Sequence, residues 1–266
     1  MMLVTILKEN IKYLKQTLTL AKADLVKFYK GAALGYLWAF IKPMVTIGVY
    51  LFAFQVGIRK GAPMDGFPFF LWLVAGLLPW FYISDALIAG TMSIRMYRQF
   101  VTKMKFPIST IPSYVLLSKL YVQLGMIVAI ILIFCLYGFY PDIYYLQFLY
   151  YIPTMLIFFI VLSWTLSSLA VISRDFENLV KSSLQALLWM TPILWNIEDV
   201  SSPTLQFILK LNPINYFIEG YRDIFLYKRW FFEGSYSLYI WLVIIVLAFI
   251  GATVYKKLHK EFADVL

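Results

Sequence analysis

Long apolar runs separated by short polar segments make up most of the chain. The runs lie near residues 36–57, 67–93, 113–139, 146–172, 178–195 and 236–257. A helix that crosses a bilayer needs about 20 apolar residues, so each run is long enough to be a membrane span. The pattern therefore predicts an all-α polytopic membrane protein with six transmembrane helices.

The first 30 residues follow a different pattern, with apolar and basic positions on separate faces of a helix. Apolar residues from Leu7 to Phe28 recur at spacings of three and four, and the lysines between them lie off that stripe. A basic amphipathic helix is typical of the membrane interface, although a short coiled coil would show a similar repeat. We predict an interface helix over residues 1–30 and a transmembrane domain over residues 31–266.

The segment between the fifth and sixth runs, residues 196–232, is too polar to span and too apolar for a free loop. Pro203 and Pro213 divide it into two pieces with helical apolar spacing, and proline suits the first turn of a helix. Re-entrant backbone is tolerated in a membrane where protein or a water-filled cavity shelters it. We predict two short helices that dip into the outer leaflet.

Composition and charge support the membrane class. The 266 residues are 62% hydrophobic and 14% charged, whereas a soluble domain has about 25% charged residues. The net charge of +9 could indicate nucleic acid, but most of the bases fall on the side that would hold both termini. The positive-inside rule explains that distribution, with Arg59 and Lys60 as exceptions. We predict cytoplasmic N- and C-termini (N-in/C-in) and no nucleic-acid partner.

Metal and catalytic signatures are missing from the sequence. Cys135 is the only cysteine and His259 the only histidine, so neither an intramolecular disulfide nor a metal site is predicted. There is no GxxxxGK[ST] phosphate loop and no serine nucleophile elbow. Asp85 is the only carboxylate clearly inside a predicted span, whereas a proton-driven carrier usually has several. The sequence predicts a transport pathway without its own energy source, and not an enzyme.

The polar segment after the second run, MYRQFVTKMKFPISTIP, mixes basic and apolar side chains on the predicted cytoplasmic side. Apolar rings in a wet loop indicate either a short helix that docks on a soluble partner or a plain interfacial connector. The candidate docking residues are Arg98, Phe100, Lys103, Met104, Phe106 and Pro107.

Two charges lie at matching depths in neighbouring predicted spans. Asp85 and Lys119 each fall seven or eight residues from the inner end of their run, which is about 10–12 Å at 1.5 Å per residue. An unpaired charge there would cost several kcal/mol, and pairing offsets much of that cost. We predict a buried structural ion pair between them; the alternatives are that Lys119 snorkels and that Asp85 lines a channel.

Four segments in order carry a resemblance to a known family. They are LGYLWAFIKP (34–43), KFPISTIPSYVLLSKL (105–120), RDFENLV (174–180) and LNPINYFIEGYR (211–222). With them the chain resembles, over nearly its whole length, the permease subunits of ATP-binding-cassette exporters of lipid-linked polysaccharide. A fifth segment, DGFPFFLWLVAGLLPWFYIS (65–84), is most similar to wall teichoic acid exporter permeases. Ala32 departs from the serine that many relatives carry.

The resemblance implies a homodimer of this chain with two copies of a separate ATPase subunit in the bacterial cytoplasmic membrane. The ATPase would hold ATP and Mg²⁺, and this chain would need no cofactor. The substrate would be teichoic acid or a related polysaccharide linked to undecaprenyl pyrophosphate. O-antigen-type polysaccharide, and drugs or small lipids, are the alternatives. A membrane-embedded glycosyltransferase and a non-transporting scaffold represent other classes, and no converging carboxylate or metal site supports the former.

The resemblance also implies roles for particular elements. The first and fifth spans would line the channel, the segment after the second span would be the coupling helix, and the two short outer helices would form an exit gate. Tyr36, Trp38 and Trp189 are candidates for stacking on sugars, although they could equally pack or lie in an interfacial belt. The candidate gate residues are Tyr216, Phe217 and Tyr221.

A lipid pyrophosphate needs cations near the inner mouth of its pathway. The candidates are Lys27, Lys30, Lys42 and Arg174. Lys42 ranks first because it lies inside an apolar run, directly before a proline, and shares a helix face with Trp38. The alternative for Lys42 is that its ammonium snorkels back to the membrane surface.

Overall fold

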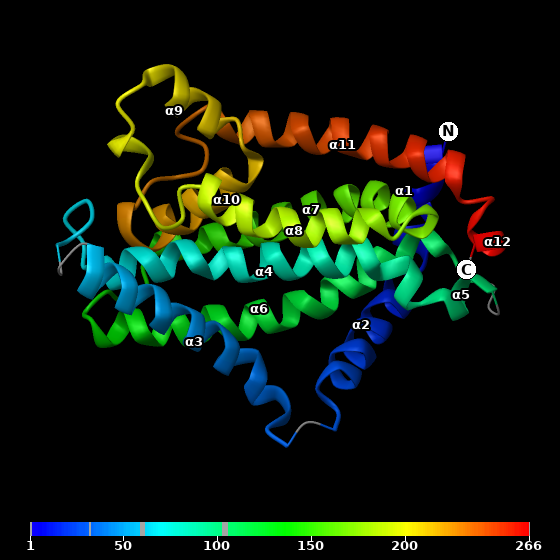
Figure 1. Cartoon of the computed structure of the whole chain (residues 1–266), viewed down its shortest axis with the longest axis horizontal. Helices are drawn as coiled ribbons and strands as arrows, with labels where there is room; N and C mark the ends of the chain where they lie inside the picture. The colour runs from blue at the N-terminus through cyan, green and yellow to red at the C-terminus, as the bar shows by residue number, and fades with distance from the viewer. Residues whose placement is uncertain (1, 32, 59–61, 103–105, 266) are drawn as a thin grey trace.

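The computed structural model describes residues 2–31, 33–58, 62–102 and 106–265, and the elements named in this part of the chain are helices. They are α1 (Met2–Lys12), α2 (Leu14–Tyr29), η1 (Gly35–Leu37), α3 (Trp38–Leu51), η2 (Phe52–Ile58), α4 (Phe69–Met96), α5 (Arg98–Thr102), η3 (Ile108–Thr110), α6 (Ile111–Leu136), η4 (Ile143–Gln147), α7 (Phe148–Ile172), α8 (Asp175–Met190), η5 (Ile197–Asp199), α9 (Pro203–Lys210), α10 (Pro213–Arg222), η6 (Asp223–Tyr227), α11 (Tyr236–Leu258) and α12 (Phe262–Val265). Figure 1 shows the long helices side by side along one axis.

The two ends of this bundle differ. Both chain termini, α5 and α12 lie at one end, and α9 projects at the opposite end (Figure 1). We call these the N/C end and the α9 end. The shared position of the termini agrees with the predicted N-in/C-in arrangement, while the orientation in a membrane stays a prediction.

Five helical segments in the described residues are long and apolar enough to cross a membrane. They are Gly35–Phe54, Phe69–Met96, Ile108–Leu136, Ile143–Ile172 and Tyr236–Leu258. Each coincides, to within a few residues, with one of the predicted runs. The class of multi-pass helical membrane protein is therefore confirmed, with five spans by this measure.

The predicted span over 178–195 is the exception, because α8 has only 16 residues. At 1.5 Å per residue α8 is about 24 Å long, shorter than the roughly 30 Å hydrocarbon layer. It stops where Pro192 follows Thr191, whose backbone is extended (ψ 137°). A residue before proline is pushed out of helical geometry. The count of six spans is thus not confirmed, although α8 still carries the chain from the N/C end toward the α9 end.

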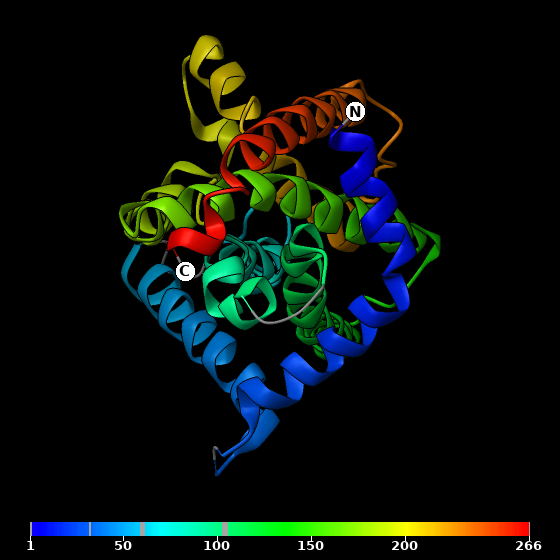
Figure 2. The same ribbon diagram turned by 90° about the vertical axis from the view of Figure 1, so that its right-hand side faces the viewer.

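Helix α4 is the centre of the bundle. In the view along the long axis α4 lies in the middle, surrounded by other helices (Figure 2). It packs against α6, α7, α8, α10 and α3, and most of its side chains are buried. The largest buried rings, Trp72 on α4 and Trp164 on α7, belong to the same continuous hydrophobic core.

The predicted interface helix is two helices, because α1 ends at Lys12 and α2 begins at Leu14. Helix α1 is held to the α6 region by polar contacts: Ser109 donates to Glu9, and Ser113 Oγ donates to Asn10 Oδ1 at 2.5 Å. Most of the apolar stripe, including Ile11, is exposed. An exposed apolar stripe fits the predicted place in the membrane interface.

Two short helices occupy the segment 196–232, as predicted. Each begins at a proline and is capped by the residue before it: Ser202 Oγ accepts from the Leu205 amide, and Asn212 Oδ1 accepts from the Ile214 amide. They differ in burial, since α10 packs against α4 while α9 has no fully buried side chain. Whether they enter the outer leaflet stays a prediction.

Candidate functional site

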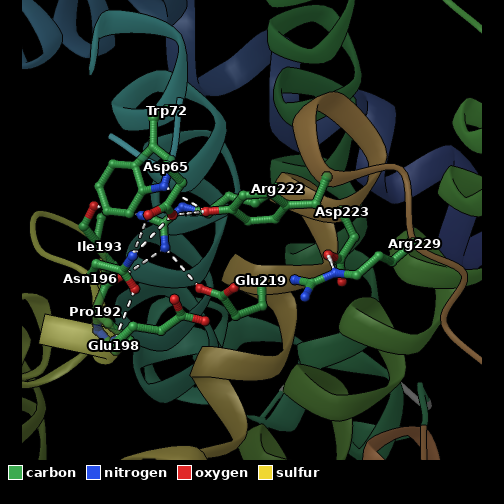
Figure 3. Close-up of polar contacts among 11 residues, drawn as sticks. Asp65, Trp72, Pro192, Ile193, Asn196, Glu198, Glu219, Arg222, Asp223 and Arg229 are labelled. Atoms are coloured by element: carbon green, nitrogen blue, oxygen red, sulfur yellow. Dashed lines mark hydrogen bonds and ion pairs between the residues drawn. The ribbon is translucent and has the colours of Figure 1, made fainter. Parts of the chain in front are cut away.

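A buried arginine joins three parts of the chain at the α9 end. Arg222 of α10 is 1% exposed. Its Nη1 donates to the carbonyl of Pro192 and to Glu219 Oε1, both at 2.8 Å, and its Nη2 donates to the carbonyl of Ile193 at 2.9 Å (Figure 3). Its guanidinium carbon lies 3.5 Å from the centre of the Trp72 ring. The Arg222 guanidinium therefore links α10 to α4 and supplies hydrogen-bond donors to the Pro192 and Ile193 carbonyls, which follow the end of α8.

Asp65 forms a second polar cluster beside this arginine. Its carboxylate accepts from the Tyr227 hydroxyl at 2.5 Å and from Asn196 Nδ2 at 2.8 and 2.9 Å. Trp72 Nε1 in turn donates to the Tyr227 hydroxyl at 2.9 Å. Asp65 has φ +50°, a backbone conformation that costs free energy for a residue other than glycine. The hydrogen bonds hold it there and tie the start of α4 to η6.

The segment after η6 is held by ion pairs. Arg229 Nε lies 2.7 Å from Asp223 Oδ1, and Lys228 Nζ lies 2.8 Å from Asp142 Oδ2. Burial raises the pKa of Asp223 to about 6, although the hydrogen bond from Arg229 opposes that rise. Gln147 adds a clamp, donating to the Arg229 carbonyl and accepting from the Phe231 amide.

These contacts border a cavity of about 770 Å³ between α9, α10 and the segment 229–239, which leads into α11 and includes its first turn. We call it the α9-end cavity. Its lining combines aromatic rings with carboxylates, and it also includes Asn215, a buried residue of α10. Concave sites with rings and a few polar groups are typical of ligand binding.

A smaller cavity of about 170 Å³ lies among α2, α3, α4 and α6, and we call it the lysine cavity. Three charged side chains line it: Lys42 of α3, Asp85 of α4 and Lys119 of α6. Aromatic rings of Phe28 and Trp38 complete part of the wall. Asp85 lies 11 residues before the end of α4, about 16 Å from that end along the helix axis. Charged groups therefore converge well inside the bundle.

The structural ion pair between Asp85 and Lys119 stays a prediction, because the two side chains interact at longer range than a direct contact. Among the described residues, no ion pair within 4 Å joins these two side chains, and Asp85 is exposed to the cavity instead of buried. The Lys119 ammonium lies 3.7 Å from the centre of the Phe28 ring, which stabilises a cation without a carboxylate. Asp85 interacts electrostatically with both Lys119 and Lys42. Two cations share one carboxylate around an open space.

The other predicted headgroup cations are dispersed. Lys27 is exposed, with its ammonium 5.1 Å from the centre of the Tyr97 ring, and Lys30 is exposed at the end of α2. Arg174 is an exposed residue at the start of α8 and does not line the lysine cavity. Of the four candidates, Lys42 alone lines that cavity.

The predicted docking rings are largely used within the chain. Phe100 lies 5.4 Å from Phe106 and 6.1 Å from Tyr114, measured between ring centres, and Phe106 lies 5.9 Å from Tyr13. Both rings thus hold α5 against α6 and the N-terminal helices and are only partly buried, so their contact with a soluble partner stays a prediction. Arg98 is exposed, and Pro107 precedes η3. Lys103 and Met104 lie outside the described residues.

The predicted gate residues are buried in α10. Phe217 packs against Phe158, Tyr221 packs against Phe148, and both are fully buried. Tyr216 alone of the three lines the α9-end cavity. The gate role of these three residues therefore stays a prediction, with Phe217 and Tyr221 buried in this conformation.

The predicted channel rings are accessible. Tyr36, Trp38 and Trp189 are all exposed, on the η1–α3 and α8 segments. Tyr36 contacts Tyr29 at 5.3 Å between ring centres. Sequence reasoning missed Asp65 and Arg222, although the spacing of Glu219 and Arg222 on one helix face was a usable signal.

A bundle of long apolar helices defines a multi-pass membrane protein. The chain belongs to the ABC-2 type transporter family, whose profile matches residues 15–226, from α2 to η6. Over 265 residues it is 27% identical to a Myxococcus xanthus protein, covering 98% of this chain and 99% of that one. Two Klebsiella pneumoniae proteins are 28% and 29% identical over 266 residues, with 98% of each chain covered. All three are named O-antigen export system permease protein RfbA.

Proposed function

We propose that this chain is the channel-forming subunit of an ATP-driven exporter that moves a lipid-linked polysaccharide of the O-antigen type across the bacterial cytoplasmic membrane. The similarity to three O-antigen export permeases over the whole chain carries this proposal. Their names favour the O-antigen alternative over the teichoic acid first expected from residues 65–84. Teichoic acid linked to undecaprenyl pyrophosphate becomes the second candidate, and drugs or small lipids the third.

ATP hydrolysis belongs to a partner subunit in this proposal. The sequence has no phosphate loop, so two copies of a separate ATPase would hold ATP and Mg²⁺. The N/C end would face them, with α5 between α4 and α6 as the coupling helix. Arg98, Lys103 and Met104 remain the proposed contacts there, because Phe100 and Phe106 are engaged within the chain.

A second copy of this chain would complete the channel. Exposed apolar side chains lie on α3 (Val45, Val49) and on α8 (Leu179, Met190). Apolar patches of this kind mark protein or lipid contacts. The proposed channel lies between the α3 and α8 faces of two copies, with Tyr36, Trp38 and Trp189 toward the polymer.

The lysine cavity is the proposed contact for the phosphate groups of the lipid carrier. Lys42 and Lys119 supply two ammonium groups inside the bundle, and Trp38 and Phe28 supply apolar walls. Charged groups inside a membrane segment are costly and are typical of a substrate pathway. Asp85 balances one of the two lysines while no headgroup is bound.

The test is ATP hydrolysis by the purified complex of this chain with its ATPase, reconstituted in lipid. An undecaprenyl-pyrophosphate-linked neutral O-antigen fragment should stimulate hydrolysis, and a lipid-linked poly(glycerol phosphate) of similar length should stimulate it less. The free lipid carrier is the control. Stimulation by the poly(glycerol phosphate) alone would replace the O-antigen proposal with teichoic acid export.

A further inference from the structure

The α9-end cavity is separate from the proposed channel face. Its lining comes from α7, η5, α9, α10, η6 and the segment leading into α11, and among the described residues none of it comes from α3 or α8. In Figure 1, α9 and the start of α11 lie on the opposite side of the bundle from α3. At about 770 Å³ the cavity falls within the roughly 300–1,000 Å³ of ligand pockets.

Aromatic rings dominate its wall. They include Phe207, Tyr216, Trp230, Phe231, Tyr236 and Tyr239. The tyrosine hydroxyls are occupied: Tyr236 donates to the Lys210 carbonyl, Tyr239 donates to the Leu211 carbonyl at 2.6 Å, and Tyr216 bonds with Ser237 at 2.9 Å. Fixed hydroxyls hold the ring faces in place. The face of an aromatic ring is negative and attracts C–H groups that carry partial positive charge, such as those on one face of a pyranose.

The charges in the wall are mainly negative. Four carboxylates, Glu198, Glu219, Asp223 and Glu233, stand against two cations, Lys210 and Arg229. Arg229 is already paired with Asp223, and Glu219 with Arg222 outside the lining. Glu198 and Glu233 form no ion pair within 4 Å among the described residues. Ionised carboxylates accept hydrogen bonds only, which suits the hydroxyl donors of a sugar and repels phosphate.

Asn215 supplies an independent sign of a ligand. Its side chain is 1% exposed and lines the cavity, and its Oδ1 has no hydrogen-bond partner among the described residues. A buried acceptor without a partner costs about 1–3 kcal/mol, so each instance in a native protein calls for a reason. A bound hydroxyl donor would satisfy it.

We propose that the α9-end cavity binds a short stretch of an uncharged glycan. This inference rests on the proposed function, in which the α9 end faces away from the cytoplasm and meets the polymer after the channel. Rings stack on sugar faces, Glu198 and Glu233 accept from sugar hydroxyls, and Asn215 Oδ1 accepts from a further hydroxyl. The excess of carboxylates disfavours polymers built on phosphodiesters.

The experiment is a binding titration on the full complex of this chain with its ATPase in nanodiscs. The probes are an uncharged mannose hexasaccharide and a poly(glycerol phosphate) of matched length, followed by tryptophan fluorescence and by calorimetry. The hexasaccharide should bind saturably and the poly(glycerol phosphate) should not. Phe207→Ala should weaken hexasaccharide binding at least tenfold, whereas Phe249→Ala, a similarly exposed ring on α11 that does not line the cavity, should change it less than twofold.

A second variant set keeps the test valid if the ring substitutions disturb folding. In a Cys135→Ala background, Phe207→Cys should react with a membrane-impermeant thiol reagent, and the hexasaccharide should protect it. Glu198→Gln with Glu233→Gln should weaken hexasaccharide binding without admitting the phosphate polymer at equal affinity. Equal effects of Phe207→Ala and Phe249→Ala, or tighter binding of the poly(glycerol phosphate), would overturn the inference.

The outcomes separate this inference from the proposed function. If lipid-linked O-antigen stimulates ATP hydrolysis while the hexasaccharide does not bind, the cavity is not a glycan site and the export function stands. If the hexasaccharide binds while no lipid-linked glycan stimulates hydrolysis, the cavity assignment stands and the export proposal fails.

Discussion

The Arg222 side chain is a buried cation, but its carboxylate partner is not fully buried. Glu219 is partly exposed, so backbone carbonyls and the face of Trp72 supply much of its environment. A planar guanidinium can bond several acceptors and stack at once, which an ammonium cannot do. The residue therefore sets how α10 sits on α4.

We predict that Arg222→Lys destabilises the permease by about 3–5 kcal/mol, the cost of disrupting a buried charge network. The lysine would keep the charge but lose two of the three hydrogen bonds and the stacking on Trp72. Thermal unfolding in detergent measures the change. Arg229→Lys is the matched control, because the Arg229 side chain is more than half exposed and a lysine can still pair with Asp223, so the change should cost about 1 kcal/mol or less.

Gly76 of α4 leaves the space that the guanidinium occupies. A Cβ at this position would lie 2.7 Å from Arg222 Nη2. Gly→Ala in a helix usually stabilises by about 1 kcal/mol, but Gly76→Ala should destabilise by about 1–3 kcal/mol because Arg222 is held by its partners. Gly48→Ala on α3, where the added Cβ would meet nothing within 4 Å beyond its chain neighbours and its own helix backbone, should be neutral or stabilising. A stabilised Gly76→Ala variant would contradict the rigid placement of Arg222.

Asp223 should make stability depend on pH. Burial raises the pKa of this carboxyl from 3.8 to about 6, so the folded state binds its proton more tightly than the unfolded state does. Its contribution to stability is therefore full below about pH 4 and is lost as pH rises through 6. The apparent Tm of the wild type, relative to that of Asp223→Asn, should fall between pH 4.5 and 7. Parallel curves for the two proteins would exclude Asp223 as the cause.

At the scale of elements, helix contacts depend on small residues where two long helices cross. A Cβ on Gly251 of α11 would lie 2.9 Å from the Val161 carbonyl oxygen of α7. On α4, a Cβ on Gly90 would overlap the side chain of Ser163. Close crossings of this kind are the usual way in which membrane helices gain packing energy.

Gly251→Leu should separate α11 from α7 and lower the yield of folded permease several-fold. The first added atom would already press on the Val161 carbonyl oxygen and the Trp164 Cβ, both of α7, and neither atom can turn aside as the end of a flexible side chain could. Size-exclusion chromatography after extraction in mild detergent measures the yield. The control is Ile250→Leu, an exposed neighbour, which should behave as the wild type.

The helices could be predicted where a single local sequence pattern sets their position. Runs of about 20 apolar residues defined five spans, and Pro203 and Pro213 defined the starts of α9 and α10. The end of α8 was misplaced because the apolar run continues past Pro192, although the proline itself ends the helix. The break at Tyr13 has no such signal, since the apolar spacing runs through it.

The site residues were less predictable, because their partners come from distant parts of the chain. Asp65 and Tyr227 are separated by 162 positions, and Trp72 and Tyr227 by 155. Spacing within one helix cannot reveal such pairs. Counting residues from the ends of the predicted spans did place Asp85 and Lys119 at the same level. It could not show that Lys42 lines the same cavity or that the Phe28 ring contacts Lys119.

At the scale of the whole molecule, the proposed dimer predicts that the α3 helices of two copies lie close together. In a Cys135→Ala background, Val49→Cys on the exposed face of α3 should form a disulfide between two copies under mild oxidation. Leu242→Cys, equally exposed on α11, should not. The bands on a non-reducing gel distinguish these outcomes, and cross-linking through Leu242 alone would move the dimer interface to α11.

The lysine cavity links this architecture to the proposed transport cycle. Lys42, Asp85 and Lys119 come from three helices, so a headgroup bound among them would contact α3, α4 and α6 together.

Lys42→Ala and Lys119→Ala should each reduce stimulation of ATP hydrolysis by lipid-linked glycan about tenfold, since each removes a charge-assisted contact to phosphate worth about 1.5–3 kcal/mol. Asp85→Asn should instead raise the apparent affinity for the lipid-linked substrate, because the carboxylate no longer competes for the two ammonium groups. The exchange of Asp85→Lys with Lys119→Asp should not restore function, because the two residues are not a direct pair and the exchange places the second ammonium on α4, away from the Phe28 ring. Recovery of wild-type stimulation by that exchange would show that a simple ion pair is what the protein needs here.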